Sequence, residues 1–273
     1  MAKQQLLGLV TALALLLGAC MSSTSPQAPP TTAATEGITI PTTEEEPSTA
    51  PTVEDLPETT EPAHCPLFHP QYSPSQIMEY FEEIVLATEY SDGVGNTALV
   101  QKWNTPMAYR IYGEPTQEDL AVLTDLFEQL NEIPGFPGIY AAADGELDNL
   151  SIRFLGPQAF TDQFSSFLGG EDAYGATQFW FYTATNDIYT ADIGYRTDID
   201  QQTRNSILLE EIFNMLGTSD TVLREDSIVY QYSNSNTALS DVDWIILKLL
   251  YDPAIQCGMD LESCRAIIGQ LYY

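Results

Sequence analysis

Four polar side chains and a glycine follow one another at regular spacing in the second half of the sequence. Glu210 and Asn214 are four residues apart, so on a helix they share one face; Glu211 lies beside them, Gly217 follows, and Asp220 comes three residues later. Carboxylate and amide oxygens are ligands that calcium and magnesium prefer, whereas zinc prefers histidine and cysteine. The pattern therefore indicates hard-cation or hydrogen-bond chemistry at the end of this helix.

A structural role for the two glutamates is a competing interpretation. Adjacent acids near the C-terminal end of a helix are disfavoured by the helix dipole, which indicates that they have a partner. Glu210 or Glu211 would then accept hydrogen bonds from the loop that carries Asp220 and Asp226, or pair with Arg224. Three interpretations stay open at this point: this structural role, a bound hard cation, and residual hydrolysis.

The beginning of the chain has the features of a targeting segment. Lys3 gives a positive start, residues 6–17 form an apolar run, and small residues lead up to Cys20. The run is short for a membrane span, so we expect a lipoprotein signal peptide at 1–20, palmitate on Cys20 and a lipid anchor on the extracytoplasmic side of a bacterial cell membrane. Residues 21–65 are rich in Pro, Thr and Glu, which predicts a disordered, stalk-like linker.

Residues 66–273 are expected to form one globular domain. All 15 Tyr, 11 Phe and 3 Trp residues lie in this part, beginning with Phe68. The whole chain has a net charge of −30, and most of that charge falls in the domain, which makes nucleic acid and anionic lipid surfaces poor partners. Cys65, Cys257 and Cys264 are candidates for a disulfide, but their spacing does not decide the pairing.

Hydrophobic periodicity predicts an α+β fold in which helices pack against a sheet. Helices are expected over 74–90, with Ser75 as its cap, and over 116–132, 200–216, 239–251 and 261–272. Strands are expected over 107–113, 149–155, 178–182 and 188–197, the last with Ile188, Ala191, Ile193 and Tyr195 buried. This order of elements favours α+β over a doubly wound fold.

The spacing Glu-Glu-x-x-Asn-x-x-Gly-x-x-Asp resembles the metzincin zinc-protease signature His-Glu-x-x-His-x-x-Gly-x-x-His/Asp. The resemblance places Glu210, Asn214 and Asp220 at the zinc-ligand positions and Glu211 at the general-base position. It implies a matrixin-like mixed sheet of four to five strands with packed helices. Val229 stands where the Met-turn methionine would be, and both helix histidines are replaced.

The only histidines, His64 and His69, precede the first expected helix, so zinc is not expected on the Glu210 helix. Zinc held by His64, Cys65 and His69 is a weaker alternative. We expect no cofactor, with calcium or another divalent cation as the remaining option.

The chain also resembles the bacterial lipoproteins of domain-of-unknown-function family 2927. The matching positions span residues 73–259 and comprise Lys102-Trp103, Glu210-Glu211, Leu216-Gly217, Asp226-Ser227-Ile228, Leu250-Tyr251-Asp252-Pro253 and Gly258-Met259. This family implies a common ancestry and no established reaction.

Together these features predict a non-catalytic binding or accessory module with a degenerate metzincin-like domain. Trp180, Tyr189 and Tyr230, together with Tyr182 and Tyr195, are expected to line a groove for an extended peptide or envelope protein. The alternatives are an atypical metallopeptidase or hydrolase that uses Glu211 as general base, and a purely structural component of the cell envelope.

Overall fold

The computed structural model describes residues 67–86, 99–164 and 173–272, all of which belong to one compact unit. The expected signal peptide, Cys20, the linker, His64 and Cys65 lie outside the described residues. Within the described ranges, no helix is both long and apolar enough to cross a bilayer.

A mixed sheet of six strands forms the centre of the described unit. The strands β2 (Met107–Gly113), β4 (Leu150–Leu155) and β6 (Asp187–Arg196) are parallel neighbours, with β3 (Ile139–Ala141) beyond β2 and β1 (Lys102–Trp103) beside the beginning of β6. The remaining strand, β5 (Gly175–Phe181), pairs antiparallel with β6. The expectation of four to five strands is therefore wrong, because β1 and β3 are too short to show a period of two.

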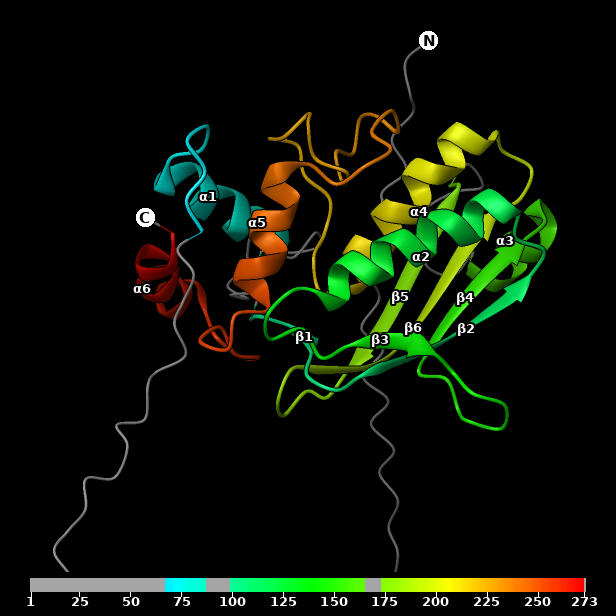
Figure 1. Cartoon of the computed structure of the whole chain (residues 1–273), viewed down its shortest axis with the longest axis horizontal. Helices are drawn as coiled ribbons and strands as arrows, with labels where there is room; N and C mark the ends of the chain where they lie inside the picture. Colours follow the sequence, from blue (N-terminus) through cyan, green and yellow to red (C-terminus); the bar gives the residue numbers. More distant parts are fainter. Residues whose placement is uncertain (1–66, 87–98, 165–172, 273) are drawn as a thin grey trace, which may run out of the picture. The chain divides into compact units, whose positions relative to one another are not determined.

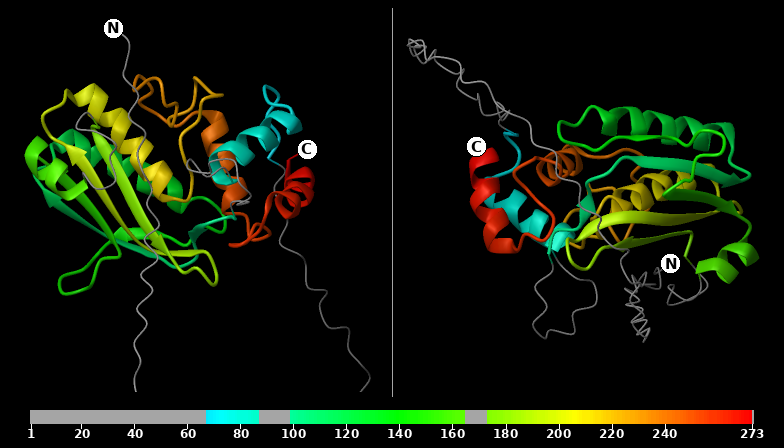
Figure 2. Two further views of the ribbon diagram at one scale, coloured as in Figure 1. Left: turned by 180° about the vertical axis from the view of Figure 1, so that it is seen from behind. Right: turned by 90° about the horizontal axis from the view of Figure 1, so that it is seen from below.

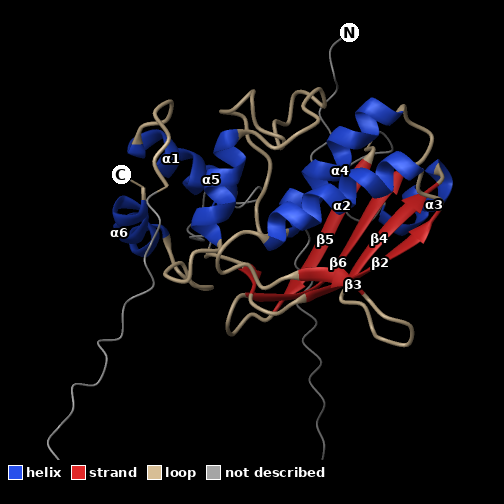
Figure 3. Cartoon of the chain, viewed as in Figure 1, coloured by secondary structure: helices blue, strands red, loops and turns tan. Residues whose placement is uncertain are grey.

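One face of the sheet is covered by two helices, α2 (Gln117–Asn131) and α4 (Gln201–Met215) (Figure 3). Alternate residues of the strands point into this layer, as Leu150, Ile152 and Phe154 do on β4. They join the apolar stripes of both helices in one core cluster. The layers thus form because strand period and helix period place apolar residues on facing surfaces.

The opposite face of the sheet carries the short helix α3 (Pro157–Phe164). Its Phe160 and Phe164 form a second, small core with Ala176 of β5, and the ring of Phe164 lies where a side chain at Gly194 would be. Even-numbered residues of β5 therefore point away from α4, whereas Thr177 reaches the α4 backbone. This alternation decides which side chains of β5 lie near the Glu210 motif.

The remaining helices gather at the end of the unit near β1, away from α3 (Figures 1 and 2). They are α1 (Pro74–Phe81), which continues as a π-helix over Glu82–Leu86, α5 (Asp241–Leu250) and α6 (Leu261–Leu271). Ser73, not Ser75, caps α1, because Ser73 and Gln76 form a reciprocal capping box.

The first and last described residues are tied together at this end. The Leu67 amide donates to the Leu271 carbonyl over 3.0 Å, and the Tyr272 hydroxyl donates to the Tyr72 carbonyl over 2.8 Å. The entry to the described unit is therefore fixed against its last helix.

Most of the longer elements agree with the periodicity of the sequence. β2 has the predicted bounds, α2 has Thr116 as its cap, and α4 follows Asp200 as its cap. The four positions predicted to be buried on β6 are buried. The expected first helix is shorter than predicted in its regular α-helical part, and its last four residues lie outside the described ranges.

Candidate functional site

Helix α4 holds the Glu210 motif in a fixed position because its first turns are anchored. Asp200 accepts from the Thr203 amide at the first turn, and Arg204 pairs with Asp119 of α2 over 2.8 Å. Both members of this ion pair are almost completely buried. The motif therefore lies on a helix that cannot shift without breaking a buried ion pair.

Gly217 turns the chain back at the end of α4. Its φ is +106°, and a Cβ at this position would lie 2.0 Å from the Gln101 carbonyl oxygen, so only glycine fits. The turn brings Asp220 to Asn214, whose Nδ2 donates to Asp220 Oδ1 over 2.9 Å. The structure thus brings together two of the three residues that the sequence pattern placed at one site.

The Asn214–Asp220 pair is incompletely satisfied. Asn214 Oδ1 is buried and has no hydrogen-bond partner within the described part of the chain. Burial raises the pKa of Asp220, and the hydrogen bond from Asn214 offsets this only in part. The pair therefore combines a carboxyl group that resists ionisation with an amide oxygen that lacks a donor.

Glu210, the third residue of the pattern, faces a different loop. Asn234 Nδ2 donates to Glu210 Oε2 over 3.5 Å, from the segment between the Asp220 turn and α5. Arg224 pairs with Asp226 over 2.6 Å. The hydrogen bond from Asn234 agrees with the structural interpretation, in which loop residues satisfy the glutamates.

Glu211 lies beneath the edge strand. Its side chain is 8% exposed, and a Cβ at Gly175 would lie 2.6 Å from Glu211 Oε1. Thr177 Oγ1 donates to the Glu211 backbone carbonyl over 2.9 Å. Glu211 is therefore covered by β5, a position that limits its access to a water molecule in the role of general base.

The loop that follows Asp220 forms a wall beside the end of α4. Thr221 and Tyr230 form an isolated parallel bridge, and the rings of Tyr230 and Tyr232 meet edge to face at 5.5 Å. Glu83 of the π-helix accepts from Thr221 Oγ1 over 2.5 Å and from the Val222 amide over 2.8 Å. Of the expected groove aromatics, Tyr230 is the one that this loop brings to the Asp220 turn.

A buried polar network holds the loop that follows Asp220 against α1 and α5. The Asp243 carboxylate accepts from Ser227 Oγ over 2.7 Å and from the Ile228 amide over 3.0 Å, and the Tyr80 hydroxyl donates to Ser227 Oγ over 2.6 Å. Burial raises the pKa of Asp243 despite these donors and those of Ser240. The network fixes the segment where the resemblance placed the Met-turn.

The other expected groove residues lie elsewhere. Trp180 lies opposite Thr190 on the strand pair and alternates with residues that face α4, so it is on the far face of the sheet. Tyr189 stacks on Tyr182 at 4.4 Å, and both are exposed. Tyr195 cannot line a groove because it is fully buried, and its hydroxyl donates to the Leu208 carbonyl. Phe179, which alternates with Trp180, packs against the main core.

The donor set at this site does not fit zinc. Glu210, Asn214 and Asp220 offer only oxygen ligands, and the Asn214 amide already donates to Asp220. Within the described ranges, no group of three or more His, Cys, Asp or Glu side chains is placed to hold a metal ion. His69 lies on the entry segment, with its Nε2 3.4 Å from Asp241.

The two described cysteines form no disulfide. Cys257 and Cys264 are free thiols and are not bonded to each other. Cys65 lies outside the described residues, so a disulfide that includes it stays a prediction.

Sequence reasoning missed Gly175, Thr177 and Asn234. The first two belong to the start of β5, where small residues hide the strand alternation that would have assigned Thr177 to the α4 face. Asn234 belongs to an irregular loop, and its contact with Glu210 carries no sequence signal.

A comparison with curated proteins finds no match. A family model described as "Protein of unknown function (DUF2927)" matches residues 74–270, which include every described helix and strand except the last residue of α6. The chain therefore belongs to the DUF2927 family.

Proposed function

We propose that this chain is a membrane-anchored extracytoplasmic lipoprotein whose metzincin-like domain, without the zinc-binding histidines, is a non-catalytic module that binds an extended peptide. The observation that carries the proposal is the edge strand β5. Within the described residues it pairs with β6 alone, and it is fastened to α4 at Glu211. The mixed sheet and this contact support the metzincin-like part of the proposal.

Within the described residues, no strand pairs with the outer edge of β5. Edges are normally blocked by charge, proline or extreme shortness, because their free N–H and C=O groups pair with other chains. The sequence of β5, Gly-Ala-Thr-Gln-Phe-Trp-Phe, has seven residues with neither charge nor proline. Such a strand is suited to accept an added peptide strand through main-chain hydrogen bonds.

Peptides with selectively methylated backbones test this mode of binding. A phage-displayed library of linear peptides would be selected on the purified chain, and the best binder synthesised with N-methyl groups at alternate residues. One set of alternate methyl groups removes the N–H groups that face β5 and should abolish binding; the other set faces solvent and should leave it intact. Equal binding of both methylated peptides would contradict strand addition.

A hydrolase or metallopeptidase is the second candidate, favoured by one observation. The orphan Asn214 Oδ1 beside Asp220 is an oxygen pair of the kind that binds a hard cation. In this alternative, Glu210, Asn214 and Asp220 hold the cation, and Glu211 activates water. The burial of Glu211 under Gly175 weighs against it.

Metal analysis and cleavage assays separate the two candidates. The protein would be purified without chelator, and its metal content compared with that of Glu210→Ala. Peptide cleavage would be compared between the parent chain and Glu211→Gln. Stoichiometric metal that is lost with Glu210, together with cleavage that is lost with Glu211, would establish the enzyme and overturn the binding module.

The membrane anchor has its own test. Palmitate labelling of the parent chain and of Cys20→Ala, in the bacterial host, should show label only on the parent. Unchanged labelling of the variant would end the lipid-anchor part of the proposal. A purely structural envelope component, by contrast, would bind neither peptide nor metal, and its deletion would cause envelope stress.

A further inference from the structure

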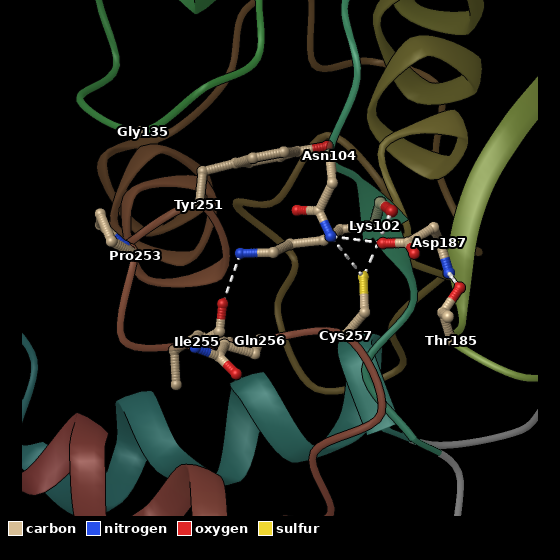
Figure 4. Close-up of a pocket in the computed structure, with 10 residues that line it drawn as sticks. All are labelled: Lys102, Asn104, Gly135, Thr185, Asp187, Tyr251, Pro253, Ile255, Gln256 and Cys257. Carbon is tan, nitrogen blue, oxygen red and sulfur yellow. Dashed lines mark hydrogen bonds between the residues drawn. The ribbon is translucent and has the colours of Figure 1, made fainter. Parts of the chain in front are cut away.

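A hollow of about 470 Å³ opens on the described unit at a place unrelated to the Glu210 motif (Figure 4). It lies where the beginnings of β1 and β6 meet the turn of the β5–β6 hairpin and the loop after α5. Its polar lining consists of Lys102, Asn104, Thr185, Asp187, Gln256 and Cys257. The volume is in the range of small-molecule sites. Such sites are mostly apolar, whereas this one has a polar lining, which favours a polar ligand over an apolar one.

The two charges of the lining are balanced, and the wall already satisfies both. The Lys102 ammonium is buried and donates to the carbonyls of Leu250 over 2.7 Å and Ile255 over 2.5 Å. The Asp187 carboxylate accepts from Asn104 Nδ2. Hydrogen bonds from Thr185 and Asn104 lower the pKa of Asp187, so it stays ionised. A hollow with one cation and one anion has no net charge to attract an ion, while the Asp187 carboxylate can still accept a hydrogen bond from a neutral hydroxyl group.

Neutral hydrogen-bonding groups make up the rest of the lining. Gln256 is exposed and carries both a donor and an acceptor, and Thr185 adds a hydroxyl. The Cys257 thiol lies 3.4 Å from Asn104 Nδ2 and donates to the Lys102 carbonyl over 3.5 Å. Burial raises the pKa of this thiol to about 11, so it is a weak hydrogen-bonding group here and not a nucleophile.

The hairpin that supplies Thr185 and Asp187 also carries a flat aromatic surface. Tyr182 and Tyr189 stack with their ring centroids 4.4 Å apart and an interplanar angle of 30°. Tyr182 is 57% exposed and Tyr189 is 38% exposed, which is unusual for large aromatic side chains that gain free energy from burial. The Tyr182 amide donates to the carbonyl of Asp187 over 2.9 Å, so the pair begins directly across the hairpin from a residue that lines the hollow. Stacked, exposed rings at this place suit a ligand with an apolar C–H face and polar edges.

We propose that this hollow is a binding site for a small neutral sugar, a mono- or disaccharide, with Gln256, Thr185 and Asp187 bonding its hydroxyl groups and the Tyr182–Tyr189 pair supporting its C–H face. A pyranose ring has that combination of an apolar face and many hydroxyl donors and acceptors. The site shares no residue with the Glu210 motif and does not depend on peptide binding at β5.

A glycan array followed by titration tests the sugar site. The full purified chain would be applied to an array of mono- and oligosaccharides, and the best ligand titrated by saturation-transfer NMR. Gln256→Ala and Tyr182→Ala should each weaken binding about tenfold, because each removes a direct contact with the sugar. The matched controls Gln158→Ala and Tyr140→Ala change exposed residues of the same types elsewhere and should leave binding unchanged.

Three results would overturn the proposal. These are an array without a bound sugar, sugar binding that is equal in the parent chain, Gln256→Ala and Tyr182→Ala, and displacement of the sugar by millimolar acetate or sulfate, which would reveal an anion site. All four substituted side chains are at the surface, so thermal melting curves should coincide with the parent's, and loss of binding is then not loss of folding. Binding of the selected peptide to the same variants measures the function of β5 independently of the sugar site.

Discussion

Two buried aspartates, Asp119 and Asp243, are both 0% exposed and both close a capping box, yet they are stabilised differently. Asp119 is paired with the Arg204 guanidinium, whereas Asp243 accepts only from hydroxyl and amide donors. Burial alone would raise both pKa values. Bonds from Thr116 and Arg204 reverse this for Asp119, and the neutral donors around Asp243 do not.

The two kinds of stabilisation occur in different parts of the fold: the ion pair in the helical scaffold, and the neutral hydrogen bonds under the surface loop that carries Tyr230. The Asp119–Arg204 pair joins two regular helices, α2 and α4, across the main core. The Asp243 network joins a helix to the irregular loop with Tyr230. A charged pair fixes elements that already have apolar stripes, whereas many directional hydrogen bonds fix a loop that has little apolar surface to bury.

Breaking the charged pair should have the largest effect. Arg204→Met keeps most of the volume but leaves Asp119 buried without a counter-charge, which should lower the free energy of unfolding by about 3 to 5 kcal/mol in urea titrations. Arg265→Met removes an exposed pair with Glu82 and serves as the control, with an expected change below about 1 kcal/mol. Equal effects of the two substitutions would contradict the claim that the buried pair stabilises the fold more than the exposed one.

Asp243→Asn should cost less, about 1 to 3 kcal/mol of unfolding free energy. The amide cannot accept from all the donors of Ser227, Ile228 and Ser240, but it leaves no unpaired charge behind. The loop with Tyr230 should lose protection against amide hydrogen exchange before α2 and α4 do. Asp241→Asn, on the exposed side of the same first turn, should leave both measurements unchanged.

Gly175→Ala should cost about 1 to 3 kcal/mol through overpacking. The new methyl group would lie 2.4 Å from Ile207 and 2.6 Å from Glu211, so β5 must move away from α4. If β5 binds peptide, the same substitution should weaken that binding. Gly156→Ala, where the methyl group meets nothing within 4 Å, is the matched control; a comparable loss in it would point to a backbone effect instead.

The smallest expected effect is on the pH dependence of stability, and the two aspartates act in opposite directions. The folded structure lowers the pKa of Asp119, so this residue contributes fully to the free energy of unfolding when the pH is above its pKa in the unfolded chain, about 4. That contribution is lost as the pH falls below about 4 toward the lower pKa of the folded state. Asp243 has a raised pKa, so stability falls as the pH rises from about 4 through its folded value.

Urea midpoints measured from about pH 3 to 7 would show this. Asp119→Asn should flatten the acid side of the profile, and Asp243→Asn the side above pH 4. A variant that flattens the opposite side would show that the assigned direction of its pKa shift is wrong.

Long periodic segments were predictable from the sequence, and short or irregular ones were not. The alternation of Met107–Gly113 and the stripe of Gln117–Asn131 left no ambiguity about type. Two residues of β1, three of β3 and the eight of α3 are too few for a period to emerge. The sheet therefore has more strands than expected, although a mixed sheet with packed helices was predicted.

The candidate site divides in the same way. The sequence pattern grouped Glu210, Asn214 and Asp220, and the structure brings Asn214 and Asp220 together through the turn at Gly217, which is local geometry. The contacts of Glu83 with Thr221 and of Asn234 with Glu210 join distant or irregular segments, and only tertiary packing decides them. The sequence therefore indicated one local contact at the end of α4, but neither the separate partner of Glu210 nor the covering of Glu211 by β5.

The hydrogen bond between Leu67 and Leu271 makes the described unit a nearly closed loop of chain. Its ends could be joined by a short peptide and new ends opened elsewhere, for example in the loop with Leu147, which is 90% exposed. Such a circular permutant would move the point where the preceding residues join the unit from the α6 end to the sheet edge near β3. It would thus test whether the position of the proposed tether matters for peptide binding.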